Sequence, residues 1–140
     1  MIKTFRGVMA DGAQDTILLH TNDGSTGYRI VNFQLIGKTP GSMTVEAVIK
    51  VYKVLQTTID GTVDFSDQTL LAAGYWVDNS GVSTPSWETI IFDKEIFNQD
   101  IYVTFFDAST SENMNYYLEL EQVKLDINSN TVATLKDMRN

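Results

Sequence analysis

The chain has 140 residues, of which 43% are hydrophobic and 20% charged, so it is long and apolar enough to form one domain with a single core. It has no cysteine, which excludes disulfides, thiolate metal sites and redox pairs, and its net charge of −8 disfavours contact with nucleic acid phosphates. We expect neither a secretory signal nor a membrane span, because no apolar run approaches about 18 residues.

Short segments that alternate apolar and polar residues, as half-buried strands do, recur along the chain. The clearest is 45–52, in which Val45, Ala47, Ile49 and Val51 share one face. Polar turn residues such as Asp11-Gly12 separate the segments. In chain order, the predicted strands are residues 15–20, 28–36, 45–52, 69–76, 88–92, 101–105, 116–126 and 131–136.

These eight strands, joined by polar turns and with no amphipathic helix between them, predict an all-β fold. We expect a single-domain antiparallel β-sandwich, jelly-roll-like, over residues 1–140, with residues 1–14 as an N-terminal arm and residues 54–68 as a long loop. A loop of that length is often a binding projection, and a short helical turn within it is an equally ordinary outcome.

The segment 116–126 changes phase along its length. Leu118 and Leu120 are the apolar pair in its first half, whereas Val123 and Leu125 are the apolar pair in its second half. A shift of one residue turns a strand's apolar set to the opposite face, and a β-bulge is the simplest way to keep both halves buried. The pattern therefore predicts a bulge near Gln122.

The middle of the chain is acidic. No basic residue lies between Lys53 and Lys94, while six acidic residues do. A solvated acidic surface is the simplest interpretation, and a docking surface for a basic partner or a cation site are the alternatives. Candidate ligands for a hard cation are Asp60, Asp64 and Asp67. We predict no resident metal and no other cofactor.

Catalytic patterns are weak in this sequence. His20 is the only histidine, and without a nucleophile motif it is expected to be structural or exposed. Glu119 and Glu121 form the one carboxylate pair with a defined geometry, but carboxylates on the outer face of a strand typically face solvent. No nucleotide, zinc or redox motif is present. We therefore predict that the protein is not an enzyme, with a small hydrolase as an alternative.

Aromatic residues occur as neighbours or near predicted loops, notably Tyr75, Trp76 and Trp87. Adjacent residues of a strand point to opposite faces, so each adjacent aromatic pair directs one ring away from the core. Such a ring can stabilise the sheet, anchor a subunit contact, or stack on a sugar. Exposed, neighbouring tryptophans above a groove would favour glycan binding, whereas burial would favour a structural role.

Several segments spread over most of the chain resemble small virion structural proteins of tailed phages of marine bacteria. These are FQLIGK at 33–38, TID at 58–60 leading to DFSDQTLLAA at 64–73, FNQDIYV at 97–103 and NYYLELE at 115–121. The resemblance implies a non-enzymatic virion structural protein, most of all a capsid decoration or cement protein that binds and stabilises the shell. It also implies a place in the virion, which is assembled in the host cytoplasm.

The implied partners are the major capsid protein or neighbouring virion proteins, and further copies of the chain. Another head-tail or tail component and a β-sandwich that binds a cell-surface glycan are the alternatives. Four of the ten basic residues lie near the two ends of the chain, which suggests attachment of the ends to an acidic surface. The interface candidates are Lys3, Phe5, Arg6, Tyr75, Trp76, Trp87, Lys136 and Arg139.

Overall fold

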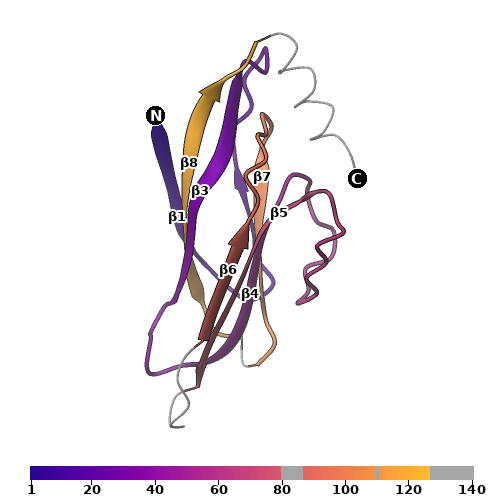
Figure 1. The fold of residues 1–140 in the computed structure, drawn as a ribbon. Helices are drawn as coiled ribbons and strands as arrows, with labels where there is room; N and C mark the ends of the chain where they lie inside the picture. The colour runs from indigo at the N-terminus through magenta and orange to yellow at the C-terminus, as the bar shows by residue number, and fades with distance from the viewer. Residues whose placement is uncertain (80–86, 110, 127–140) are drawn as a thin grey trace.

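Two antiparallel sheets face each other in the computed structural model, which describes residues 1–79, 87–109 and 111–126 (Figure 1). Within these residues there are eight strands and no helix, so no helix there could cross a membrane. The predicted all-β sandwich is confirmed. The strands are β1 (Ile2–Met9), β2 (Gln14–Ile17), β3 (Thr26–Gly37), β4 (Thr44–Tyr52), β5 (Leu70–Asn79), β6 (Trp87–Phe92), β7 (Ile101–Asp107) and β8 (Met114–Lys124).

The strand order is close to that of a jelly roll, in which strands from the two halves of the chain pair with each other. The three-stranded sheet has the order β1-β8-β3, and the five-stranded sheet has the order β2-β7-β4-β5-β6. The first strand therefore pairs with the last, the second with the seventh and the fourth with the fifth, which is the nested pairing of a jelly roll. The topology differs from that of a regular jelly roll at β6, which pairs with β5 instead of β3.

The core lies between the inner faces of the two sheets. The alternation predicted for 45–52 is confirmed, because the side chains of Val45, Ala47, Ile49 and Val51 are at most 1% exposed. They pack in one cluster with the inward residues of the opposite sheet, such as Leu118. Burial of each such aliphatic side chain stabilises the fold by about 1.5–3 kcal/mol relative to exposure.

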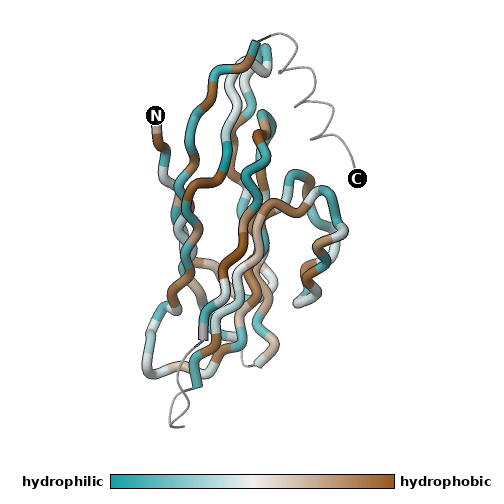
Figure 2. The backbone as a smooth tube through the Cα atoms, in the orientation of Figure 1, coloured by the Kyte–Doolittle hydropathy of each residue, from teal (hydrophilic) through white to brown (hydrophobic). Residues whose placement is uncertain are grey.

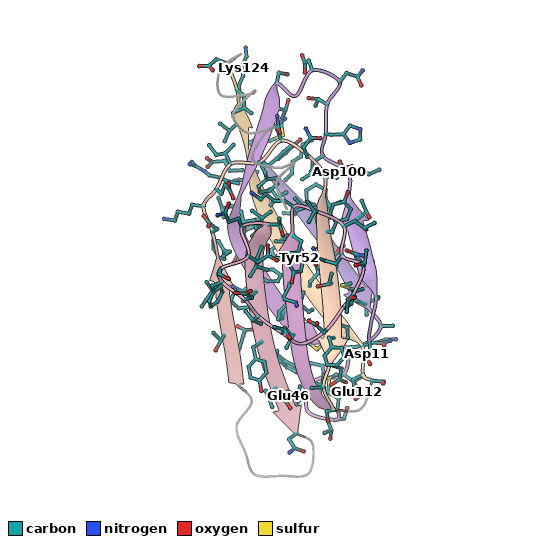
Figure 3. All side chains as sticks on the ribbon, turned by 90° about the vertical axis from the view of Figure 1, so that its right-hand side faces the viewer. Asp11, Glu46, Tyr52, Asp100, Glu112 and Lys124 are labelled. Carbon is teal, nitrogen blue, oxygen red and sulfur yellow. The ribbon has the colours of Figure 1, made fainter. Side chains whose placement is uncertain are left out.

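The other face of β4 is buried as well, which the half-buried pattern does not predict. Val48, Lys50 and Tyr52 alternate with the core residues and are 3–7% exposed. Residues 53–69, between β4 and β5, form a long loop without helix or strand that lies over this outer face (Figures 1 and 3). Figure 2 shows that polar and apolar residues mix along this loop.

The predicted bulge is in the wrong strand. β8 pairs with β3 without interruption through Gln122, and the register shift lies in β3, where Val31 is the extra residue between Ile30 and Asn32. β8 needs no bulge because its second apolar pair, Val123 and Leu125, points to the opposite side of the chain from the first pair. There Leu125 lies beside Ile96 against Gly27, where an added Cβ would come within about 3 Å of both.

The N-terminal arm is also a wrong prediction. Residues 2–9 form β1, which pairs with β8 from Ile2↔Glu121 to Met9↔Met114. The predicted strand 131–136 lies outside the described residues. The expected number of strands is therefore reached with β1 instead of that segment.

Glycine is required where the two sheets approach closely between β3 and β5. A Cβ added to Gly74 would lie 2.6 Å from Leu35 Cδ1 and 3.2 Å from Ile90 Cδ1. A methyl group at this position forces neighbouring side chains out of their rotamers or moves the strand. The turns use glycine differently, since Gly12 and Gly41 have φ angles of 81° and 84°, which L side chains rarely adopt.

We predict that Gly74→Ala lowers the free energy of unfolding by about 1–3 kcal/mol, because the added methyl overpacks this contact. Leu35→Ala alone should also destabilise, by about 2–5 kcal/mol, through the cavity that it leaves. The double variant should lose clearly less than the sum, since each change relieves the other. Urea denaturation of the three variants measures this coupling, and strictly additive losses would contradict the tight contact.

Candidate functional site

His20 is part of a clamp at one end of the sandwich. Its Nδ1 lies 2.7 Å from Asp100 Oδ1, and the same oxygen accepts hydrogen bonds from the amides of Leu19 (2.8 Å) and His20 (3.0 Å). Asp100 directly precedes β7, so these contacts hold the segment after β2 against the start of β7. Burial alone would raise the pKa of Asp100, but the hydrogen bonds from His20 and Leu19 outweigh it and lower the pKa.

The two strand carboxylates are engaged separately on the outer face of β8. Glu119 Oε2 accepts a hydrogen bond from the Tyr117 hydroxyl at 3.2 Å, while Glu121 forms a close ion pair with Arg29 on β3. Both contacts lie on the sheet surface. This arrangement stabilises the pairing of neighbouring strands.

The three candidate cation ligands are not brought together. Asp64 and Asp67 each accept bonds from the amide and hydroxyl two residues on, at Ser66 and Thr69, and Asp60 contacts Lys50 and the Thr62 amide. These bonds lower the pKa of Asp64. In the part of the chain that the structure describes, no group of three acidic or histidine side chains could hold a metal ion.

Two buried lysines fasten the loop to the outer face of the five-stranded sheet. Lys50 Nζ donates to the Thr62 carbonyl at 2.5 Å and lies 3.4 Å from Asp60 Oδ1. Lys53 Nζ lies 3.0 Å from Glu95 Oε2, beyond the end of β6. Their side chains are only 4% and 3% exposed. A buried ammonium group needs such partners, so these contacts fix where the loop lies.

A second fastening joins the start of the loop to β2. Gln14 Nε2 donates to the Gln56 carbonyl at 3.0 Å, and Gln14 Oε1 accepts from the Gln56 amide at 2.9 Å. The base of the loop is closed by the Lys53 amide, which donates to the Thr69 carbonyl at 2.8 Å. The loop is therefore held along its length, and Tyr52 at the centre of Figure 3 marks the sheet surface beneath it.

A groove of about 770 Å³ lies between the far part of the loop and strands β5 and β6. We call it the loop groove. Phe65 and Ile91 line it and are 67% and 50% exposed. Its charged lining consists of three carboxylates and one ammonium, and the ammonium is that of Lys53. The lining residues are Lys53, Phe65, Asp67, Gln68, Glu95 and residues 70–73 and 91–93.

The outer face of the three-stranded sheet has no such cover from the described residues, and we call it the open face. Val8, Asn115 and Ile36 lie side by side across its three strands, and Arg6, Tyr117 and Gln34 form the next row. These six residues belong to the lining of a shallow groove of about 710 Å³. Val8 and Ile36 are 53% and 55% exposed, so the open face presents apolar side chains to solvent.

The structure separates the predicted interface residues. Arg6 lies on the open face, and Lys3 is exposed on the edge strand β1. Phe5 instead packs against the core, and Trp76, 8% exposed, belongs to the core cluster. The inner phase of their strands directs both side chains into the sandwich, and their role in a contact stays a prediction.

Tyr75 points to the opposite side of β5 from Trp76 and is half-buried. Its hydroxyl donates to Glu46 Oε1 at 3.0 Å, and burial together with Glu46 raises its pKa. Trp87 is the first residue of β6 and pairs with Val77. Lys136 and Arg139 lie outside the described residues.

Sequence reasoning missed Lys50, Lys53 and Phe65. Lys50 alternates with the inward residues and so reads as solvent-facing, whereas Lys53 directly follows the predicted strand; only the apolar run before Lys53 hinted that both faces are covered. Sequence reasoning also missed Val8, Ile36 and Tyr117. Their role depends on which sheet the long loop lies over, and no pattern in the sequence indicates this. Comparison with known protein families, curated proteins and solved structures gives no match.

We predict that Lys50→Met speeds amide hydrogen exchange across residues 57–64 about tenfold or more. The reason is that hydrogen bonds from a charged donor contribute about 1.5–3 kcal/mol, and this variant removes the one that holds the loop at Thr62. Exchange within β4 should change much less. Lys38→Met removes an exposed lysine and serves as the control. Unchanged exchange in the loop would show that Lys50 does not hold it.

We also predict that Asp100→Asn destabilises the protein at neutral pH by about 1–2 kcal/mol, because charge-assisted bonds to three donors are weakened. The pKa of Asp100 is lowered on folding, so its contribution is present above the unfolded pKa near 3.9 and is lost as pH falls through the lower folded value. Denaturation of both proteins at several pH values should therefore converge in acid. A difference that stays constant down to the lowest pH would contradict this linkage.

Proposed function

We propose that this chain is a non-enzymatic structural protein of a phage virion, a decoration or cement protein that attaches to the capsid shell through its open face. The observation that carries the proposal is the asymmetry of the sandwich. One outer face is covered in part by the protein's own loop, and the other presents Val8 and Ile36 to solvent. Apolar side chains gathered on one surface are typical of protein contact sites.

The charges of the open face also support attachment to a protein surface. Within the described residues, Arg29 has its ion-pair partner in Glu121, whereas Arg6 takes part in no ion pair. Arg6 lies directly beside Tyr117 in the register of the sheet. Arginine and tyrosine are enriched at the centres of protein interfaces. An acidic patch on the shell would complement Arg6, and the symmetry of a shell would repeat this contact many times.

A glycan-binding module is the second candidate, and Tyr117 is the observation that favours it. Its neighbours across the open face are Gln34 and Arg6, and Asn115 lies in the next row. An aromatic ring flanked by amide groups suits a sugar, which offers an apolar face and several hydroxyl groups. Trp76 does not contribute, because it lies in the core.

The test uses particles of the phage that encodes this chain. Mass spectrometry of purified virions should find the protein at a copy number that matches the symmetry of the shell. Particles made without it should take up the purified protein again. Absence of the protein from intact virions would contradict the proposal.

We predict that Ile36→Lys and Val8→Lys each reduce this uptake about tenfold or more, since a charge replaces an apolar contact at the interface. Leu18→Lys is the matched control, because Leu18 is 73% exposed but lies outside the open face. The three variants should unfold at similar temperatures. Equal loss for Leu18→Lys would contradict docking through the open face, and uptake that is unchanged while a glycan array gives Tyr117-dependent signals would favour the second candidate.

A further inference from the structure

The loop groove combines an exposed apolar wall with carboxylates, and this combination restricts what it can bind. Phe65 from the loop and Ile91 from β6 expose apolar surface in the same groove. A volume of about 770 Å³ is within the usual range of ligand sites and exceeds the size of one side chain. The groove is therefore large enough for several residues of an extended chain.

The electrostatics of the loop groove favour a cation. Asp67, Asp93 and Glu95 contribute three negative charges, and the one ammonium group, that of Lys53, is buried against Glu95. The net formal charge of the lining is thus −2. An anionic ligand would meet carboxylates and no accessible ammonium in this lining. A guanidinium or ammonium group would meet complementary charge.

The carboxylates of the loop groove can accept further hydrogen bonds. Asp93 Oδ1 accepts the Glu95 amide at 2.9 Å, and Asp67 Oδ1 accepts the Thr69 amide and hydroxyl. Glu95 uses Oε2 for Lys53. Within the described residues, the second oxygen of each carboxylate has no hydrogen bond. These oxygens can accept bonds from a bound arginine or lysine without breaking the contacts that hold the loop.

We propose that the loop groove binds an extended peptide segment of a partner protein in which apolar residues alternate with arginine or lysine. The apolar residues pack against Phe65 and Ile91, and the basic residues face Asp67 and Asp93. The contact is weak and salt-dependent, because the carboxylates lie near solvent. This site is distinct from the open face, so it does not depend on attachment of that face to a capsid.

The experiment titrates the isotope-labelled protein with a capped pentapeptide of alternating leucine and arginine and follows amide chemical shifts. We expect shifts in residues 65–73 and 91–95, and clearly weaker ones with the matching peptide of leucine and glutamate. Phe65→Ser and Asp93→Asn should each raise the dissociation constant about two- to fivefold or more. The matched controls are Leu55→Ser, which alters another exposed apolar residue of the loop, and Glu88→Gln, which alters an exposed carboxylate of β6 outside the groove.

Three results of the peptide titration would overturn the proposal. These are no shifts at millimolar peptide, equal shifts with the acidic peptide, and shifts confined to another surface such as the open face. Equal weakening by the control variants would also overturn it, because the effect would then not depend on the groove. The variant sites are exposed, so the labelled spectra themselves report whether each protein remains folded.

Discussion

The burial of Lys50 is the constraint on which the organisation of this protein depends. Its ammonium group lies on the outer face of the central strand β4, where an uncompensated charge would cost several kcal/mol. The Thr62 carbonyl and Asp60 satisfy it, and both belong to the loop that follows β4. The loop must therefore lie on the sheet for the lysine to be tolerated, and the lysine in turn keeps a long loop in place. Tyr52 adds to this, with the Lys50 ammonium 5.4 Å from its ring centroid.

This constraint makes the two outer faces of the sandwich unlike each other. The five-stranded sheet has apolar or buried residues on both faces of β4, whereas β8 in the three-stranded sheet alternates buried and half-buried residues along most of its length. Because the loop crosses only part of the five-stranded sheet, a groove remains between it and β5 and β6, with the Lys53–Glu95 pair in its lining. One interaction network thus covers part of one surface and shapes a groove beside it, while no described residue covers the outer face of the other sheet.

The sequence predicts some strands of this fold and not others, depending on which interactions stabilise each strand. Alternation in 45–52 and 101–105 predicts β4 and β7, because inward residues face one continuous core. The bulge was assigned to β8 although β3 carries the clearer signal: Tyr28 and Ile30 precede Val31, and Phe33 and Leu35 follow in the opposite phase. β1 reads as an arm because Lys3 and Arg6 interrupt its apolar residues, and its pairing depends on a partner more than a hundred residues away. The loop groove depends on the loop, whose docking rests on Lys50, a residue that the alternating pattern assigns to solvent.

The four edge strands of the described sheets carry features that disfavour the addition of a further strand. β2 and β6 are edges of only four and six residues, and the edge strand β3 is interrupted by its bulge at Val31. β1 is longer and regular, but Lys3 lies opposite Leu120, so a charged residue occupies the inward face at this edge. Short edges, bulges and inward charges are the features by which β proteins avoid edge-to-edge pairing. The two outer faces differ from these edges in their exposed apolar side chains, such as Ile36 and Ile91, and they differ from each other because Lys50 holds the loop against one of them.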